Sequence, residues 1–392
     1  MRRFLADFAF PNAASGLVGF IFATTGPVAI VLAVGAQGGL SESDLSSWIF
    51  GAFFINGLIS IAFCLYHRQP LVFFWSIPGA VLVGPALGHL SFPEVIGAFI
   101  ATGALMTALG LSGWVRRCAQ AAPMPIVMAM VAGVFLRFGT GLVYAVRDEV
   151  AVVAPMVLAF IVVSFWKKLE RIVPPLIGAL IVGVLAVSFT GSFEAKGQEI
   201  LKLALPNLYA PAFSWQAMIE LVVPLAITVL VVQNGQGFAV LSAAGHKPPI
   251  DAIAVACGAG SIVTAFVGSV STCLTGPVNA IISFSGEKHR HYTAGVLVGL
   301  LALVFGLLSP LFVRLLLSTP PAFIAALGGL AMLRVLQTAF GVAFGGKFSL
   351  GALVTFLVTV ADVPIFNIGA AFWGLVIGFG ISWLLERKDF NS

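Results

Sequence analysis

Long stretches of this sequence contain no charged residue, and that scarcity of charge limits what the chain can fold into. Only 9% of the 392 residues are Asp, Glu, Lys or Arg, whereas 60% are hydrophobic. An ordinary soluble domain is about a quarter charged, so a water-soluble protein of this length would lack the polar surface it needs. The composition therefore excludes a soluble enzyme and a secreted module, and lipid is the solvent that fits the chain.

The remaining polar residues form no pattern of a nucleic-acid, metal or cofactor site. The net charge is +5, but the basic residues are scattered singly or in pairs without a basic face, so nucleic acid is not an expected partner. The four cysteines form no C-x-x-C pair and are expected to be packed apolar side chains; they are Cys64, Cys118, Cys257 and Cys273. No nucleophile–base or metal-ligand spacing occurs, so we expect neither an enzyme nor a cofactor.

Apolar stretches bounded by charged, Gly-rich or Pro-rich breaks predict an all-α integral membrane protein with fourteen spans. The predicted spans are 13–36, 45–65, 70–88, 93–112, 123–144, 149–166, 172–189, 216–240, 249–266, 268–285, 291–309, 320–341, 348–363 and 365–385. Placing both termini in the cytoplasm puts most of the 20 Lys and Arg residues on the inner side, as the positive-inside rule requires. The polar segment 190–214 then lies outside.

The sequence also contains an internal repeat, which predicts two inverted units. Shifting the chain by about half its length aligns residues that are rare in apolar spans: Pro123 with Pro320, Arg137 with Arg334, and Gly79 with Gly276. Seven spans per repeat is an odd number, so the second copy crosses the bilayer upside down. The predicted units are 1–189 and 215–392, joined by the outer loop 190–214. Inverted repeats are typical of secondary transporters; a duplicated scaffold or channel is the alternative.

Spans three and ten are short and interrupted at equivalent places. Each begins with β-branched, aromatic or hydroxyl residues, meets a Pro/Gly break at Pro78-Gly79 or Gly276-Pro277, and then continues as a helical run. This pattern predicts a short extended stretch before a half-helix. Two such helix starts at mid-membrane would present N–H groups and positive dipole ends to an anion. Two proline-kinked helices without a ligand are the alternative.

Polar residues inside the spans supply the other candidates. The amides of Gln233 and Asn234 can both donate and accept, which suits a carboxylate or a carboxylic acid; a polar helix end is the alternative. Thr24 and Thr25 precede Pro27 in span one and could bind substrate or satisfy a kink. The intramembrane arginines Arg137 and Arg334 could pair with substrate or have a structural role. The substrate-binding candidates are Thr24, Thr25, Trp75, Ser76, Gly79, Gln233, Asn234, Cys273, Leu274, Thr275, Gly276 and Asn279. The proton-coupling candidates are Glu220, Asp251 and Asp362.

Four segments in order resemble the benzoate/proton symporter family, BenE, which is similar to uracil-permease-type transporters. They are Phe8–Gly26, Ser76-Ile77-Pro78-Gly79, Val232-Gln233-Asn234-Gly235-Gln236-Gly237 and Leu274-Thr275-Gly276-Pro277-Val278-Asn279-Ala280-Ile281. The resemblance covers nearly the whole chain. It implies a multi-pass protein of the bacterial inner membrane that imports benzoate, or a similar small aromatic carboxylate, with a proton. An anion exchanger, a channel or a nucleobase-type permease of the same fold is the alternative.

The resemblance also implies a division of labour within the fold. It implies a core domain, 13–112 with 216–309, and a gate domain, 123–189 with 320–385, that move against each other. Substrate would bind between the half-helices of spans three and ten. In the uracil-type carriers span eight supplies a carboxylate there, and Gln233 stands at that place in this chain, which fits an anionic substrate. Fold-level analogy implies a homodimer through the gate domains.

Overall fold

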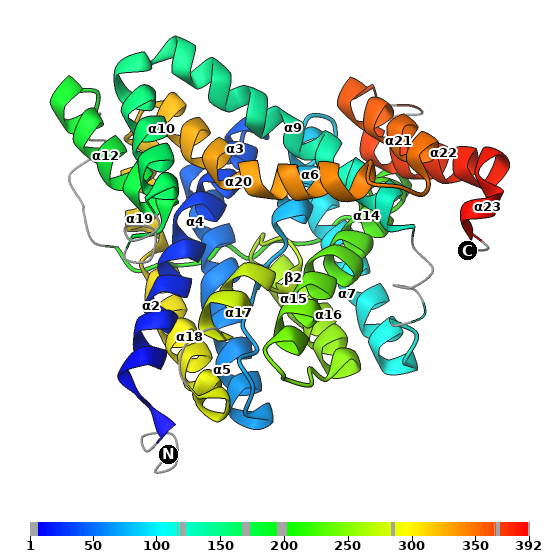
Figure 1. Cartoon of the computed structure of the whole chain (residues 1–392), viewed down its shortest axis with the longest axis horizontal. Coiled ribbons are helices and arrows are strands. Elements are labelled where there is room, and N and C mark those ends of the chain that lie inside the picture. Colours follow the sequence, from blue (N-terminus) through cyan, green and yellow to red (C-terminus); the bar gives the residue numbers. More distant parts are fainter. Residues whose placement is uncertain are drawn as a thin grey trace.

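The computed structural model describes residues 7–115, 117, 123–166, 173–193, 202–283, 287–363, 365 and 369–390, and these are mostly helical (Figure 1). The first part of the chain forms α2 (Phe10–Thr24), α3 (Gly26–Gln37), α4 (Glu42–Phe50), η1 (Gly51–Ile55), α5 (Asn56–His67), β1 (Phe73–Trp75), α6 (Ile77–Ala86), α7 (Phe92–Ser112), α9 (Met124–Asp148), α10 (Val150–Phe165) and α12 (Pro175–Thr190).

The second part of the chain is also mostly helical. It forms α13 (Trp215–Ala217), η2 (Met218–Val222), α14 (Val223–Ile227), η3 (Thr228–Gln233), α15 (Asn234–Ala243), α16 (Ile250–Ala265), β2 (Thr272–Leu274), α17 (Gly276–Ser283), η4 (Lys288–Arg290), α18 (His291–Leu307), α19 (Ser309–Leu317), α20 (Pro321–Ala343), α21 (Ser349–Ala361), α22 (Ala370–Leu385) and α23 (Arg387–Phe390). In both parts a strand of three residues precedes a short helix.

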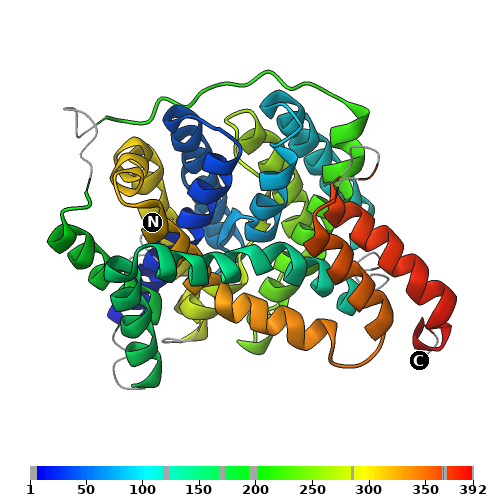
Figure 2. The same ribbon diagram turned by 90° about the horizontal axis from the view of Figure 1, so that it is seen from above.

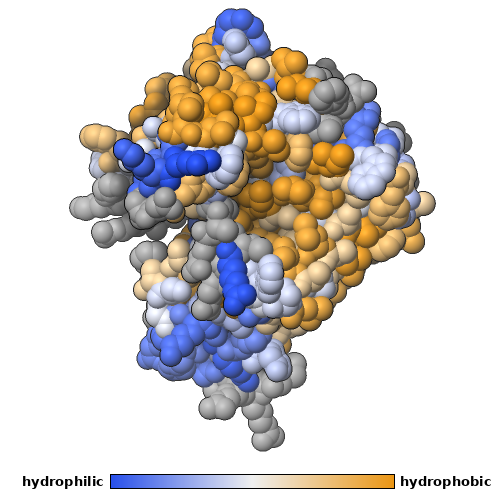
Figure 3. Space-filling model, turned by 90° about the vertical axis from the view of Figure 1, so that its right-hand side faces the viewer, coloured by the Kyte–Doolittle hydropathy of each residue, from blue (hydrophilic) through white to orange (hydrophobic). Residues whose placement is uncertain are grey.

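Helix lengths and composition confirm a helical membrane protein. Within the described ranges, seven helices are long and apolar enough to cross a membrane, and further apolar helices have 10–17 residues. Each predicted span overlaps at least one of the observed helices. Between spans eleven and twelve lies a short helix that the sequence reading did not separate, α19. Figure 3 shows hydrophobic residues covering much of one side of the molecule. The number of spans and the inverted repeat stay predictions.

The first apolar helix is broken at Thr25, where the backbone leaves the helical region (φ −89°, ψ −103°). Pro27 at the start of α3 has no N–H, so one carbonyl of the preceding turn loses its helical partner. The hydroxyls of Thr24 and Thr25 donate to carbonyls three and four residues earlier in α2. Both hydroxyls are thus bound within α2, next to the kink.

The two predicted extended stretches are confirmed, and they pair with each other. β1 and β2 are antiparallel, with Phe74 opposite Cys273. The ladder extends by one bond at each end, from Ser76 N to Ser271 O at 2.9 Å and from Thr275 N to Val72 O at 3.1 Å. Each strand runs directly into a half-helix, α6 or α17, and β2 lies near the centre of the molecule (Figure 1). The pairing therefore holds the starts of the two half-helices close together.

The helices pack as two groups around this sheet. The lateral group consists of α9, α10, α12, α20, α21 and α22, in which α9 packs along α20 and α21, and α10 along α12. The central group consists of α2 to α7 and η2 to α18, in which α7 packs along α16, and α5 along α18. Figure 2 shows α9 and α20 side by side across one side of the molecule, with α12 near one end and α22 near the other. Cys64, Cys257 and Cys273 are buried and unpaired; Cys118 lies outside the described residues.

Candidate functional site

A cavity of about 830 Å³ lies between the central and lateral helix groups. From the central group it is lined by α2, α3, β1, η3 and the starts of the two half-helices, and from the lateral group by α9, α10, α12 and α20. Its volume falls in the range of roughly 300–1,000 Å³ that is usual for small-molecule sites. Most of its wall is apolar, and its few polar groups come from different elements.

Aromatic rings form one wall of this cavity. Phe74 and Trp75 of β1 both line it. Phe53 packs behind them, with ring centroids 5.2 Å from Phe74 and 4.8 Å from Trp75. Trp75 is only 3% exposed, and its indole Nε1–H has no hydrogen-bond partner among the described residues. The backbone pairing of β1 with β2 therefore holds two rings where a flat apolar ligand can pack against them.

Amides and a hydroxyl lie near the half-helix starts. Gln233 and Gln236, one helical turn apart, and Thr275 all line the cavity. Gln236 lies directly over the first residue of α17: a Cβ added to Gly276 would sit 2.6 Å from the Gln236 amide carbon. Gln236 was not among the sequence candidates, although it belongs to the same amide run as Gln233. These side chains offer donors and acceptors beside a helix N-terminus.

A guanidinium lines the same cavity from the lateral group. Arg334 of α20 lines the cavity and donates to Gln337 Oε1 at 3.1 Å. Among the described residues it makes no ion pair with a carboxylate. Arg137, its counterpart in the predicted repeat, lies instead at a second, much smaller cavity and pairs with Asp362 at 3.1 Å. Arg137 is thus paired with a carboxylate, whereas Arg334 lines the large cavity.

The start of α6 differs in detail from the predicted anion site. The Gly79 N–H donates to Ser76 Oγ at 3.1 Å, so Ser76 caps the half-helix and uses the amide that was expected to bind substrate. Neither Ser76 nor Gly79 lines the cavity, whereas Ile77 and Pro78 between them do. The cap places the dipole end of α6 toward the cavity without leaving the Gly79 amide open.

Two asparagines among the candidates bind the sheet. Asn234 Oδ1 accepts from Leu274 N at 2.8 Å, and Asn279 both accepts from Val72 N at 3.0 Å and donates to Val72 O at 3.1 Å. Non-helical backbone at membrane depth needs such partners, because lipid offers none. The buried residues Ser60 and Ser261 do the same for Phe73 N and Thr272 N, and neither was singled out from the sequence.

The other substrate candidates lie away from the cavity wall. Cys273 and Leu274 are buried in β2, at 1% and 0% exposure. Thr24 and Thr25 bind carbonyls of their own helix, as described above. Trp75, Gln233 and Thr275 are thus the candidates that the structure brings together on the wall. The lateral residues of the wall, such as Met124, Phe135 and Phe160, were not predicted, because an apolar residue facing a cavity has the same sequence signal as one facing lipid.

The three proton-coupling candidates lie in different surroundings. Glu220 is 5% exposed and its Oε2 lies 2.9 Å from His89 Nε2. Asp362 pairs with Arg137 close by. Asp251 lies in the first turn of α16 and is exposed. The large cavity has no acidic residue or histidine on its described wall, and no group of three or more potential metal ligands occurs in the described part of the chain.

The apolar helices, the broken segments at the centre and the ligand-sized cavity between two helix groups define a membrane transporter. The chain matches the model of BenE, the benzoate membrane transport protein family, over residues 6–384. It belongs to this family, which is a family of transporters and not of enzymes.

Two relatives match the chain along almost its whole length. The inner membrane protein YdcO of Escherichia coli (strain K12) is 27% identical over 375 residues, which cover 94% of each chain. The benzoate membrane transport protein of Acinetobacter baylyi is 26% identical over 392 residues, covering 99% of this chain and 98% of that one. Both support the family assignment.

Solved anion transporters share the fold. The murine Slc26a9 anion transporter in its inward-facing state has a TM-score of 0.66 at 16% identity, covering 97% of this chain and 69% of that one. The transmembrane domain of the cyanobacterial bicarbonate transporter BicA has a TM-score of 0.63 at 16% identity, covering 95% of this chain and 99% of that one. At this identity the likeness concerns the fold alone.

Proposed function

We propose that this protein imports benzoate, or a similar small aromatic carboxylate, together with a proton. The observation that carries the proposal is the combination around one cavity of aromatic rings, side-chain amides and an arginine that makes no ion pair with a carboxylate among the described residues. A ring can pack against Phe74 and Trp75, and a carboxylate can accept from Gln233, Gln236 and Arg334. The printed name of the Acinetobacter relative, a benzoate transporter, supports the same substrate.

The proposed transport mechanism is alternating access. The central group is the core domain and the lateral group is the gate domain, in a fold of fourteen spans arranged as two inverted repeats. The cavity lies between the two groups, so sliding of one group against the other would open it to either side in turn. Its lateral wall includes Met124, Pro174 and Val342, which lie at the predicted cytoplasmic ends of their spans. In the proposed orientation, with both termini cytoplasmic, the structure is therefore open inward. A homodimer through the gate domains remains part of this proposal.

Electrostatics favour a proton as the coupled ion. Moving one anion inward against a membrane potential costs about 2.3 kcal/mol per 100 mV. A proton carried in the same cycle cancels that charge, and the pH gradient then drives uptake. The described cavity wall has no acid that would repel the substrate carboxylate.

A panel of ligands tests the substrate class directly. Purified protein is heated with benzoate, substituted benzoates, bicarbonate, uracil and xanthine, and the thermal midpoint is measured. We expect benzoate-like acids alone to raise the midpoint, because a ligand that binds only the folded state stabilises it by an amount that grows with the ratio of ligand concentration to Kd. Stabilisation by nucleobases but not by benzoate would contradict the proposal and favour a nucleobase permease. Stabilisation by bicarbonate alone would favour an inorganic anion exchanger.

A further inference from the structure

Glu220 lies in a tight contact between the two helix groups, at the end of α6 opposite the large cavity. We define the Glu220 cluster as Glu220, His89 and Gly369. Glu220 belongs to the π-helical segment η2, and His89 follows α6, so both are in the central group. Gly369 is the N-cap residue of α22 in the lateral group. Short π-helical segments are frequent at functional sites.

Glu220 is the residue of this cluster that contacts both groups. Its Oε2 lies 2.9 Å from His89 Nε2 within the central group. Across the interface, its carboxylate accepts a hydrogen bond from the backbone amide of Gly369. The approach is so close that a Cβ at Gly369 would lie 2.5 Å from Glu220 Oε1. The carboxylate also lies at the N-terminus of a helix of 16 residues, where the dipole favours negative charge.

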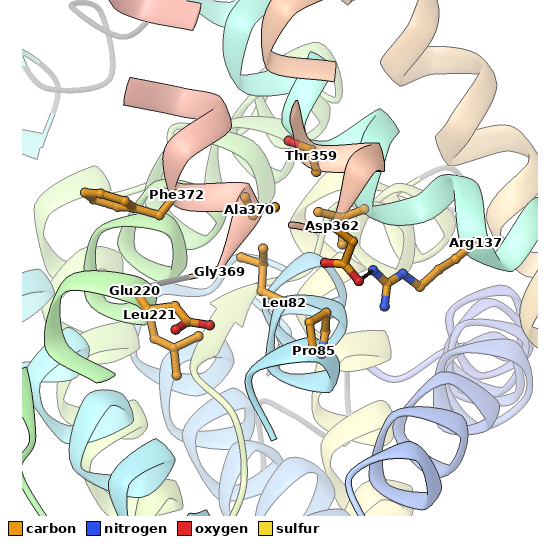
Figure 4. A pocket seen from close by; sticks show the side chains of 12 residues that line it. Leu82, Pro85, Arg137, Glu220, Leu221, Thr359, Asp362, Gly369, Ala370 and Phe372 are labelled. Atoms are coloured by element: carbon orange, nitrogen blue, oxygen red, sulfur yellow. Dashed lines mark hydrogen bonds and ion pairs between the residues drawn. The ribbon is translucent and has the colours of Figure 1, made fainter. Parts of the chain in front are cut away.

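The space around the cluster is nearly closed. A cavity of about 20 Å³, room for roughly one water molecule, is lined by Glu220, Leu82, Gly369 and the Arg137–Asp362 pair. Figure 4 shows Leu82 and Pro85 of α6 between Glu220 on one side and Asp362 with Arg137 on the other. This contrasts with the 830 Å³ cavity beside the first residues of the same helix.

From these contacts we infer that Glu220 is a proton-binding site that controls opening of the face of the transporter opposite the large cavity. Ionised Glu220 accepts from the Gly369 amide and holds α22 against η2, so the face is closed. A proton taken from the solution on that side binds a carboxylate oxygen and removes the charge that the amide and the α22 dipole stabilise. The face then opens, and closing returns the proton to solution. In the proposed orientation this is the outer face, so external acid favours the state that takes up substrate.

The other charged groups near Glu220 do not take its place in holding the two helix groups together. His89 lies in the same helix group, so its contact with Glu220 orients the carboxylate but does not hold the two groups together. Asp362 is paired with Arg137, which reduces its repulsion of Glu220. Glu94 of α7 is half-buried, and its carboxylate accepts from Ser91 Oγ and N. Among the described residues of the elements packed against η2, no other charged side chain faces the cluster.

This inference deepens the proposed function, since it assumes alternating access, but its test needs no substrate. Leu82→Cys places a thiol in the small cavity, where Leu82 is 7% exposed, and Leu205→Cys places one at a site that is 89% exposed. Purified protein is kept in detergent, so that the reagent can reach both faces of the molecule. It is treated with a polar thiol reagent at about pH 8 and at about pH 5. The rate at Leu82→Cys is divided by that at Leu205→Cys, and the parent chain without either substitution gives the background.

We expect the normalised labelling of Leu82→Cys to rise about three-fold or more as the pH falls. With Glu220→Gln, which cannot ionise, it is high at both pH values. Gly369→Ala pushes the carboxylate away and also raises labelling at the higher pH, and it serves if Glu220→Gln does not fold. Gly380→Ala is the matched control, since it lies in the same helix with open space around it; it leaves the pH response unchanged.

Two results would overturn the inference. One is labelling at Leu82→Cys that does not change with pH in the otherwise unaltered chain. The other is an unchanged pH response in Glu220→Gln or, where that variant does not fold, in Gly369→Ala. A protein that shows the expected labelling but does not transport benzoate would contradict the proposed function and would still support this inference.

Discussion

Two kinds of side-chain amide have separate roles in this molecule. The short side chains of Asn234 and Asn279 bind backbone atoms of the paired strands, whereas the longer Gln233 and Gln236 line the cavity. The difference follows from position: an asparagine beside a non-helical strand at membrane depth satisfies backbone groups that lipid cannot. From the sequence alone all of them are polar residues inside apolar spans, so their roles could not be told apart.

Removing Asn279 should therefore affect folding. We expect Asn279→Leu to leave the Val72 N–H without a partner, at a cost of about 1–3 kcal/mol, whereas the Val72 carbonyl keeps its bond from Thr275 N. The measurement is the thermal midpoint of the purified protein. Thr140→Val is the control, since its exposed hydroxyl bonds only its own helix. A variant as stable as the control would show that the sheet does not need this side chain.

Gln233 and Thr275 should instead affect ligand binding. We expect Gln233→Ala and Thr275→Val each to weaken benzoate binding several-fold, because each removes a hydrogen bond worth about 0.5–1.5 kcal/mol from the proposed site. Isothermal titration with benzoate measures the affinity, and the thermal midpoint without ligand checks the fold. Unchanged affinity in both variants would place the substrate elsewhere.

His246 should make stability depend on pH. Burial, together with nearby His291 and Lys288, lowers the pKa of His246 to about 4 from its usual 6.5. The unfolded chain therefore binds an extra proton between these values, so the free energy of unfolding falls as the pH drops from about 6.5 toward 4. Thermal midpoints at pH 7 and pH 5 should differ less in His246→Gln, which cannot titrate. An equal difference in both proteins would contradict this reading.

At the scale of elements, the half-helices were the most predictable part of the chain. Proline lacks a backbone N–H, and at the second helical position an N–H would have no acceptor within the helix. Ser76-Ile77-Pro78-Gly79 therefore predicted a helix start with an extended stretch before it. The cap formed by Ser76 follows the same logic, since serine is favoured at this position. The pairing of β1 with β2 was not foreseen, because it joins residues about 200 positions apart and has no local signal.

The close approach of α15 to the start of α17 gives a prediction at this scale. A methyl group at Gly276 would lie 2.6 Å from the Gln236 side chain. We expect Gly276→Ala to displace Gln236. The loss in the free energy of benzoate binding should then exceed the loss in the free energy of unfolding. Gly341→Ala in α20, which has open space around it, is the control. Equal affinity in the two variants would mean that Gln236 does not bind the ligand.

At the scale of the whole molecule, the sequence predicted the apolar helices and their order but only part of the site. Charge scarcity and Pro/Gly breaks are local features, so helix positions followed from them. The lateral wall of the cavity did not, because Phe135 and Phe160 look like any lipid-facing residue until two helix groups are packed together. The contact of Glu220 with Gly369 was likewise hidden, since it depends on how the groups meet.

The whole molecule also offers a way to separate pH control from proton transport. External acid should increase the rate of benzoate uptake even if no proton is carried, because protonation of Glu220 favours opening of the outer face. A faster rate of uptake alone therefore does not demonstrate symport. Net accumulation that is faster than in protein-free liposomes does, because it requires energy from the gradient and exceeds the diffusion of neutral benzoic acid through the lipid. Uptake of labelled benzoate into proteoliposomes, with an imposed pH gradient acid outside and no membrane potential, is thus the most direct test. The account predicts accumulation above equilibrium that collapses when a protonophore is added. Uptake that stops at the passive equilibrium level, with or without the protonophore, would contradict it.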